Sequence, residues 1–194
     1  MGELSTEMRM IHHLAEMGHD VDYWTDAPLD YSMEPVLKWP KTLRNFVFHE
    51  GKAALAKTPR QLAPEDVGRM FREHEKNPYD VIFGTAHTAI DQGTWLKKAI
   101  NLPLAVQILD IPYWRIDPLG MHEVYQQAVL KLPNLSSWLF DNYKAEWDFW
   151  FSKLKELDAI ILIASPVKDL LLEYSKQDVS YKTHIVHHGS LDHP

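Results

Sequence analysis

Segments with apolar residues at helical spacing alternate along this chain with short runs that are apolar on both faces. Residues 5–17 have the helical spacing, with Ser5 or Thr6 as the amino cap and Gly18 as the stop. The short runs are rich in Val and Ile, as interior strands of a parallel sheet are. They lie at residues 20–26, 80–84, 104–109, 158–164 and 183–187.

Helical patterns fill the gaps between these runs, near residues 89–100, 118–131, 137–156 and 166–176. Residues 35–76 interrupt the alternation, and we expect a helical insertion there, broken at Pro40, Pro59 and Pro64. Strands that alternate with helices predict an α/β fold, a Rossmann-like doubly wound parallel sheet. We expect residues 1–194 to form one such domain.

The start of the chain departs from that pattern, because a strand normally precedes the first helix of a doubly wound sheet. The opening "MGELSTEM" predicts a glycine loop and a helix with no strand ahead of them. We therefore expect a sheet that lacks its first strand. The strands near 20–25 and 80–84 should then close on each other or borrow a strand from a partner chain.

Composition narrows the function classes. The net charge of -7 argues against a surface built to bind nucleic acid. The absence of cysteine excludes disulfides, thiolate zinc sites and a cysteine nucleophile. The sequence has neither a signal-peptide pattern at its start nor an apolar run of membrane-spanning length, which predicts a cytoplasmic protein.

The eleven histidines raise the question of a metal site. His12 and His13 are adjacent, so a helix directs them about 100° apart. His187 and His188 would point to opposite faces of a strand, and no acidic cluster lies near them in sequence. We therefore expect no bound metal.

Two segments combine aromatic with charged residues. The stripe from Trp138 to Leu154 has helical spacing and is more typical of a core than of a lipid anchor. Residues 36–60 contain three aromatic side chains and six basic ones against Glu50 alone. They predict either a solvated helical face or a peripheral contact with the inner face of a membrane or with a phosphorylated acceptor. The basic residues are Lys38, Lys41, Arg44, Lys52, Lys57 and Arg60.

Five segments follow Gly2 in a fixed order: "EMGHDVDYWT", "YDVIFGTAHTA", "INLPLAVQILDIPYW", "LDAIILIASPVKDLL" and "HIVHHGSLD". Their order resembles the amino-terminal domain of a GT-B glycosyltransferase of family-four type, over nearly the whole chain. The resemblance implies one half of a GT-B fold, with residues 188–194 starting the linker to a donor-binding domain.

The resemblance also implies a function. The chain would bind the acceptor, a glycan or a lipid-linked sugar, while a carboxyl-terminal domain or partner chain binds the nucleotide-sugar co-substrate. No cofactor and no metal are implied, and this chain alone would not transfer sugar. The alternatives are a subunit of a split glycosyltransferase and a binding module that has lost the chemistry.

Ligands of an open parallel sheet collect at the carboxyl ends of its strands. His87 and Asp110 follow two such ends and are the expected catalytic residues, although a loop histidine and a turn cap would also explain them. The family's histidine before this aspartate is replaced here by Leu109, which cannot bind a hydroxyl. Ser165 follows a third end. The expected acceptor-binding residues are Gly2, Glu3, Thr85, Tyr113, Trp114 and Arg115.

Overall fold

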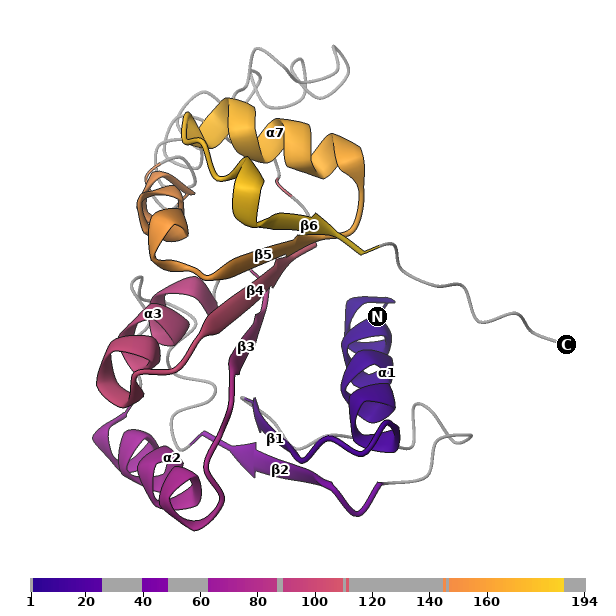
Figure 1. Ribbon diagram of the computed structural model, residues 1–194, viewed down its shortest axis with the longest axis vertical. Coiled ribbons are helices and arrows are strands. Elements are labelled where there is room, and N and C mark those ends of the chain that lie inside the picture. Colours follow the sequence, from indigo (N-terminus) through magenta and orange to yellow (C-terminus); the bar gives the residue numbers. More distant parts are fainter. Residues whose placement is uncertain are drawn as a thin grey trace, which may run out of the picture. The chain divides into compact units, whose positions relative to one another are not determined.

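The computed structural model describes residues 2–25, 40–48, 63–86, 89–109, 111, 145 and 147–186, with residues 2–8 described by their backbone. The chain divides into two compact units, Met1–Pro78 and Tyr79–Pro194. Figure 1 shows a parallel sheet in each unit, with two strands in the first and four in the second. Helices flank these sheets, which confirms the predicted Rossmann-like α/β fold class.

In the first unit, α1 (Gly2–Glu16) is followed by β1 (Val21–Thr25), and β2 (Leu43–Val47) lies parallel to β1. Between α1 and β1, Gly18 has a φ of 94°, which glycine adopts without a steric penalty. One face of the strand pair packs against α1. The apolar side chains in this contact are Met10, Ile11, Ala15, Val21, Tyr23 and Leu43.

Aromatic rings cover the opposite face of the strand pair, because successive side chains of a strand alternate between its faces. Trp24 and Phe46 stack with their ring centroids 4.6 Å apart. The guanidinium of Arg69, from α2 (Pro64–Lys76), lies 5.2 Å from the Trp24 centroid and 5.9 Å from the Phe46 centroid. Arg69 Nη1 also donates to the backbone oxygen of Val47 at 2.9 Å. These contacts hold α2 against the strand pair through cation–π attraction and a hydrogen bond.

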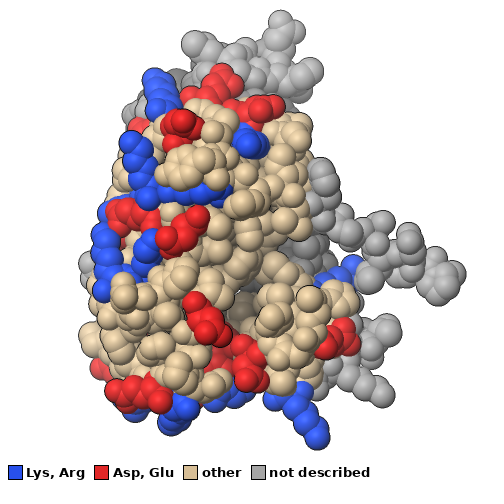
Figure 2. Space-filling model, viewed as in Figure 1, with Lys and Arg blue, Asp and Glu red and all other residues tan. Residues whose placement is uncertain are grey.

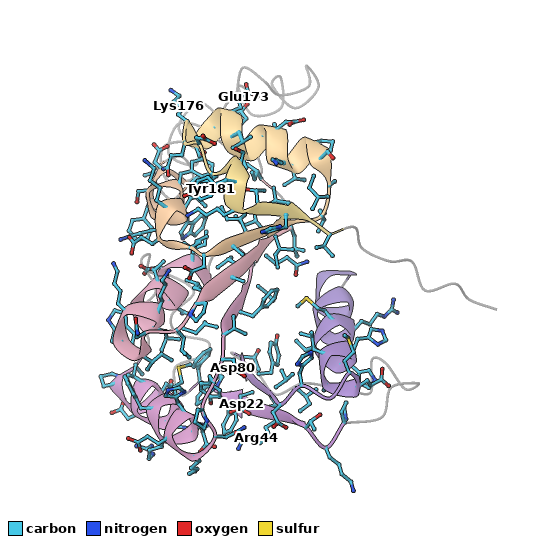
Figure 3. The ribbon with its side chains drawn as sticks, viewed as in Figure 1. Asp22, Arg44, Asp80, Glu173, Lys176 and Tyr181 are labelled. Carbon is cyan, nitrogen blue, oxygen red and sulfur yellow. The ribbon has the colours of Figure 1, made fainter. Side chains whose placement is uncertain are left out.

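β2 lies within residues 35–76, where we predicted a helical insertion. The expectation is wrong for Leu43–Val47, although a helix does begin at Pro64. The strand carries Arg44 directly opposite Asp22 of β1, and Figure 3 shows these two side chains on the neighbouring strands. Pairing with β1 and this cross-strand ion pair stabilise a strand that the local sequence pattern does not predict.

The second unit places its four strands in the order β3-β4-β5-β6, and every pairing is parallel. From β4 onward, each strand therefore lies beside the strand that precedes it along the chain. The elements are β3 (Ile82–Thr85), α3 (Ala89–Ile100), β4 (Leu104–Ile108), η4 (Leu154–Glu156), β5 (Ala159–Leu162), α7 (Ser165–Ser175), η5 (Ser180–Lys182) and β6 (Thr183–Ile185).

The core of the second unit lies on one face of this sheet, because right-handed crossovers between sequential parallel strands place their helices on the same side. Ile90 of α3 and Leu171 of α7 contribute to it together with the helical residues 147–153. The inward-facing residues of the two central strands, β4 and β5, are fully buried: Leu104, Val106, Ile108, Ile160 and Leu162.

Residues 147–153 supply the largest side chains of this core. Trp147, Trp150 and Phe151 are each at most 4% exposed, and the two indoles meet edge to face at 5.3 Å. Burial of a tryptophan or phenylalanine is worth several kcal/mol, about 3–5 on truncation to alanine. The described part of the aromatic stripe is therefore core, as predicted, while Trp138 and Tyr143 lie outside the described residues.

Two lysines fasten the amino-terminal edge of the sheet. Lys97 Nζ donates to Asp158 Oδ2 at 2.6 Å, and the same oxygen accepts the Leu104 N–H at 2.7 Å. Lys182 Nζ donates to the backbone oxygens of Lys155 and Leu157 at 2.9 and 2.8 Å. Burial, reinforced by the nearby Lys97 charge, lowers the pKa of Lys182. These hydrogen bonds pair the Asp158 carboxylate and the Lys182 ammonium with groups of the second unit.

β1 belongs to the first unit and β3 to the second, so the expected closure of these two strands on each other, or on a strand from a partner chain, stays a prediction.

Candidate functional site

The carboxyl ends of the four parallel strands lie at one edge of the second unit. β3 ends at Thr85, and the described residues that follow the other ends include Leu109 after β4 and Ser165 after β5. Parallel pairing through β4 and β5 brings these three residues to the same edge. This edge is where an open parallel sheet binds its ligands, so it is the candidate site.

The turn after β3 is tightly constrained. A Cβ on Gly84 would lie 2.8 Å from Ala89 Cβ and 3.3 Å from Val106 Cγ2, so only glycine fits between the strand and α3. Two residues on, Ala86 has a φ of 65°, a left-handed conformation that costs a residue with a Cβ about 1–2 kcal/mol. The Ala89 N–H closes the turn by donating to the backbone oxygen of Ala86 at 3.1 Å. Strain of this kind is concentrated at functional sites.

Asp91, in the first turn of α3, is an acidic residue that the sequence analysis did not select. Burial raises the pKa of its carboxyl, while the Lys153 ammonium opposes that rise. A carboxyl with a raised pKa close to a ligand edge is a candidate proton donor or acceptor. One feature of the sequence could have indicated Asp91. It lies in the first turn of the helix that follows β3, next to the carboxyl end of that strand.

The start of α7 is a second polar feature of the edge. Ala164 occupies the amino-cap position in an extended conformation and makes no side-chain capping bond. Pro166 lies within the first turn, and this turn contains no acidic residue. Ser165 is exposed beside it. A helix start of this composition favours an anion or a sugar hydroxyl over a cation.

The remaining predicted site residues fall outside this description. His87, Asp110, Tyr113, Trp114 and Arg115 lie outside the described residues, as does the side chain of Glu3. Gly2 was expected in a loop, but it is the first residue of α1, in the first unit. The structure therefore brings the chain segments that lead to His87 and Asp110 to the same edge of the sheet. The catalytic role of these two side chains stays a prediction.

Several ion pairs join basic and acidic side chains on the described surface. Lys98 Nζ and Lys153 Nζ lie 2.5 and 3.3 Å from the two carboxylate oxygens of Glu156. Figure 2 shows basic and acidic side chains interleaved on the face in view. Within the described ranges no three His, Asp or Glu side chains gather in a way that would hold a metal ion. None of the described helices is both long and apolar enough to cross a bilayer.

The sequence matches no protein-family model and no curated protein.

Proposed function

We propose that this chain is the acceptor-binding amino-terminal domain of a nucleotide-sugar-dependent glycosyltransferase of GT-B type. It would act with a donor-binding domain to transfer a sugar to a glycan or lipid-linked acceptor. The observation that carries the proposal is the all-parallel sheet in sequential order, whose carboxyl ends lie at one edge with Thr85, Leu109 and Ser165. In this architecture such an edge is the ligand-binding edge.

The proposed roles follow from side-chain chemistry. His87 is two residues beyond Thr85, and Asp110 directly follows Leu109. An imidazole and a carboxylate can each accept a hydrogen bond from an acceptor hydroxyl and orient it for attack on the donor sugar. Arg115 would hold an anionic group of a lipid-linked acceptor. The chain alone would bind an acceptor without transferring sugar, because the donor is bound elsewhere.

A second candidate is a binding module that keeps the fold without the chemistry. The observation that favours it is Leu109, which follows β4 where the resembled family has a histidine. An isobutyl side chain can pack against a sugar ring but can neither donate nor accept a proton. A subunit of a split enzyme would retain acceptor binding in the same place.

Two residues of the proposed membrane-contact segment 36–60 make contacts within the protein instead. Arg44 is paired with Asp22 and Glu73, and Phe46 is stacked on Trp24. Lys41 is exposed and remains a candidate for contact with anionic headgroups. The proposal therefore assigns lipid contact to Lys41 and to the basic residues of this segment outside the described ranges.

An NMR titration of the isotope-labelled chain tests the proposal. Acceptor-type glycosides should shift the amide signals of Thr85, Leu109 and Ser165, whereas nucleotide sugars should bind no tighter than about 1 mM, or about -4 kcal/mol. Asp110→Asn and His87→Ala should weaken the acceptor shifts. His184→Ala, which alters an exposed residue of β6, should leave them unchanged.

Two results would overturn the proposal. Micromolar binding of a nucleotide sugar would assign the donor site to this chain. Acceptor shifts confined to the amino ends of the strands would place the ligand at the wrong edge. Acceptor binding that survives both substitutions would favour the binding module over the catalytic domain.

A further inference from the structure

The Glu16 carboxylate of α1 lies between two imidazoles. Its Oε1 is 3.2 Å from Nε2 of His12, and its Oε2 is 3.0 Å from Nδ1 of His13. The two imidazoles differ in their surroundings, because the His12 side chain is 4% exposed and the His13 side chain is 56% exposed. One carboxylate therefore contacts a buried imidazole and an exposed one.

The contact with Glu16 selects the tautomer of His12. An ionised carboxylate only accepts hydrogen bonds, so the nitrogen that faces it, Nε2, carries the hydrogen of the neutral ring. The other nitrogen, Nδ1, then has a lone pair and can only accept a hydrogen bond. This atom is buried, and no described residue donates to it. The result is a buried acceptor that the described part of the chain does not satisfy.

Packing alone does not explain a histidine at this position. A buried polar atom without a partner destabilises the folded state, and an apolar side chain would avoid that loss. α1 already packs on the strand pair through Met10, Ile11 and Ala15. A carboxylate that orients an imidazole while the second nitrogen stays open is instead the arrangement by which a histidine accepts a hydrogen bond or a proton from a hydroxyl.

We propose that Nδ1 of His12 binds a hydroxyl group of a sugar or polyol, and that Glu16 is the residue that positions the imidazole for this contact. A hydroxyl supplies the one donor that Nδ1 lacks and carries no charge into a buried site. An ammonium group would have to give up its hydration there, at a much larger cost. A metal ion would need further ligands, and the described residues gather no such set.

The proposed site has two structural consequences. Nδ1 of His12 is enclosed in the ligand-free chain, so a bound hydroxyl must replace part of its present cover and change the surroundings of the imidazole. The side chains of His12, His13 and Glu16 all belong to the first unit. The site therefore does not depend on the glycosyl transfer proposed for the strand ends of the second unit, and either proposal can fail while the other holds.

Nitrogen NMR of the full chain, with isotope-labelled histidine, tests the site above neutral pH. In the ligand-free chain the His12 signals should be those of a protonated Nε2 and of an Nδ1 that neither carries a proton nor accepts a hydrogen bond. Methyl glucoside should move the Nδ1 signal toward that of a hydrogen-bonded nitrogen, with a dissociation constant of about 1–10 mM. The matched probe is the same glucoside with every hydroxyl methylated. It keeps the ring but has no donor, so it should produce no shift.

Chain variants separate binding from packing, and the spectrum of His12→Gln identifies the His12 signals. Glu16→Gln keeps the size of the side chain but offers the ring a donor as well as an acceptor, so the hydrogen of His12 can move to Nδ1. We expect this variant to bind the glucoside at least about tenfold more weakly. His13→Gln removes only the exposed imidazole, and Glu173→Gln removes one exposed negative charge of α7. Both should bind like the unaltered chain. Circular dichroism and the thermal midpoint check that each variant is folded.

The spectra also define the results that contradict the proposal. A protonated Nδ1 in the ligand-free chain would show that Glu16 does not select the tautomer. An Nδ1 signal that is already hydrogen-bonded without ligand, and that the glucoside does not move, would assign the position to an ordered water only. An equal response to both glucosides, or equal weakening by His13→Gln and Glu16→Gln, would each overturn the proposal, as would the absence of any shift at about 100 mM glucoside.

Discussion

The guanidinium of Arg44 donates two hydrogen bonds to the carboxylate of Asp22, from Nε to Oδ1 and from Nη2 to Oδ2, each at 2.7 Å. The two residues lie directly opposite each other in the β1–β2 register, and the Asp22 side chain is only 6% exposed. A third bond joins Arg44 Nη1 to Glu73 Oε2 at 3.0 Å and so ties α2 to the strands. One arginine thereby connects three elements of the first unit.

Arg44→Lys should lower the free energy of unfolding by about 1–2 kcal/mol, because an ammonium keeps the charge but cannot make the two parallel bonds to a nearly buried carboxylate. Urea unfolding followed by circular dichroism measures the change. The control is Lys76→Ala, which removes an exposed ion pair with Glu73 and should change stability by less than about 1 kcal/mol. Equal effects of the two substitutions would show that the paired geometry contributes nothing.

Asp158→Asn should reduce the loss of stability in acid. The hydrogen bond from Lys97, and further that from the Leu104 backbone, hold the pKa of Asp158 below its ordinary value of 3.8. A depressed carboxyl pKa stabilises the folded state above pH 3.8, and this contribution is lost as the pH falls through the lowered pKa. Compared with the unaltered chain, the variant should be less stable at neutral pH and should lose less stability as the pH falls from neutral into the acid range. Asp169→Asn, at an exposed position of α7, should retain the acid loss of the unaltered chain.

Asp91→Asn should have the opposite dependence on pH. Burial raises the pKa of Asp91 above 3.8, so the folded state binds a proton more tightly than the unfolded state and loses stability as the pH rises through the raised pKa. Removing the charge should therefore increase stability near neutral pH, with the gain vanishing at about pH 3. Thermal unfolding at a series of pH values measures it. A gain that is the same at every pH would contradict the assigned cause.

Gly84→Ala should destabilise the second unit by about 1–3 kcal/mol, since the added methyl group overlaps Ala89 and must push α3 away from β3. Gly68→Ala is the matched control, because its methyl group would lie 3.3 Å from the movable end of Arg72 inside α2. That change should stabilise by about 0.5–1 kcal/mol through helix propensity. Denaturant titration of both variants gives the comparison, and a neutral Gly84→Ala would contradict the tight turn.

Ala86→Gly should raise the free energy of unfolding by about 1 kcal/mol, because glycine adopts a φ of 65° without the clash that alanine suffers. Ala99→Gly, at an exposed position in the last turn of α3, should instead lower it by about 0.5–1 kcal/mol. The two measurements separate relief of strain from the general cost of glycine. A loss of stability in both variants would mean that Ala86 stores no strain.

The strands of the second unit were predictable from sequence because each is a short apolar run, and a run that is apolar on both faces indicates a buried strand. β2 was not, since Leu43–Val47 includes Arg44 and Asn45 and depends on partners in β1 and α2 that a local pattern cannot contain. The edge that carries the candidate site was predictable from the order of the elements. Asp91 and the left-handed Ala86 were not, because desolvation and backbone strain arise only from the assembled turn.

The sequential order of β3, β4, β5 and β6 bears on how the second unit forms during synthesis. Each later strand pairs with the strand synthesised before it. Most of the chain loops closed by this pairing are short, so their entropy cost is small. The connection between Ile108 and Ala159 is the longest, so the parallel strands β3 and β4, joined through α3, must wait for β5. Trp147, Trp150 and Phe151 arrive from the ribosome immediately before β5. Folding of the unit is therefore expected to be limited by the emergence of this aromatic segment, which covers the waiting strands just as their next neighbour becomes available.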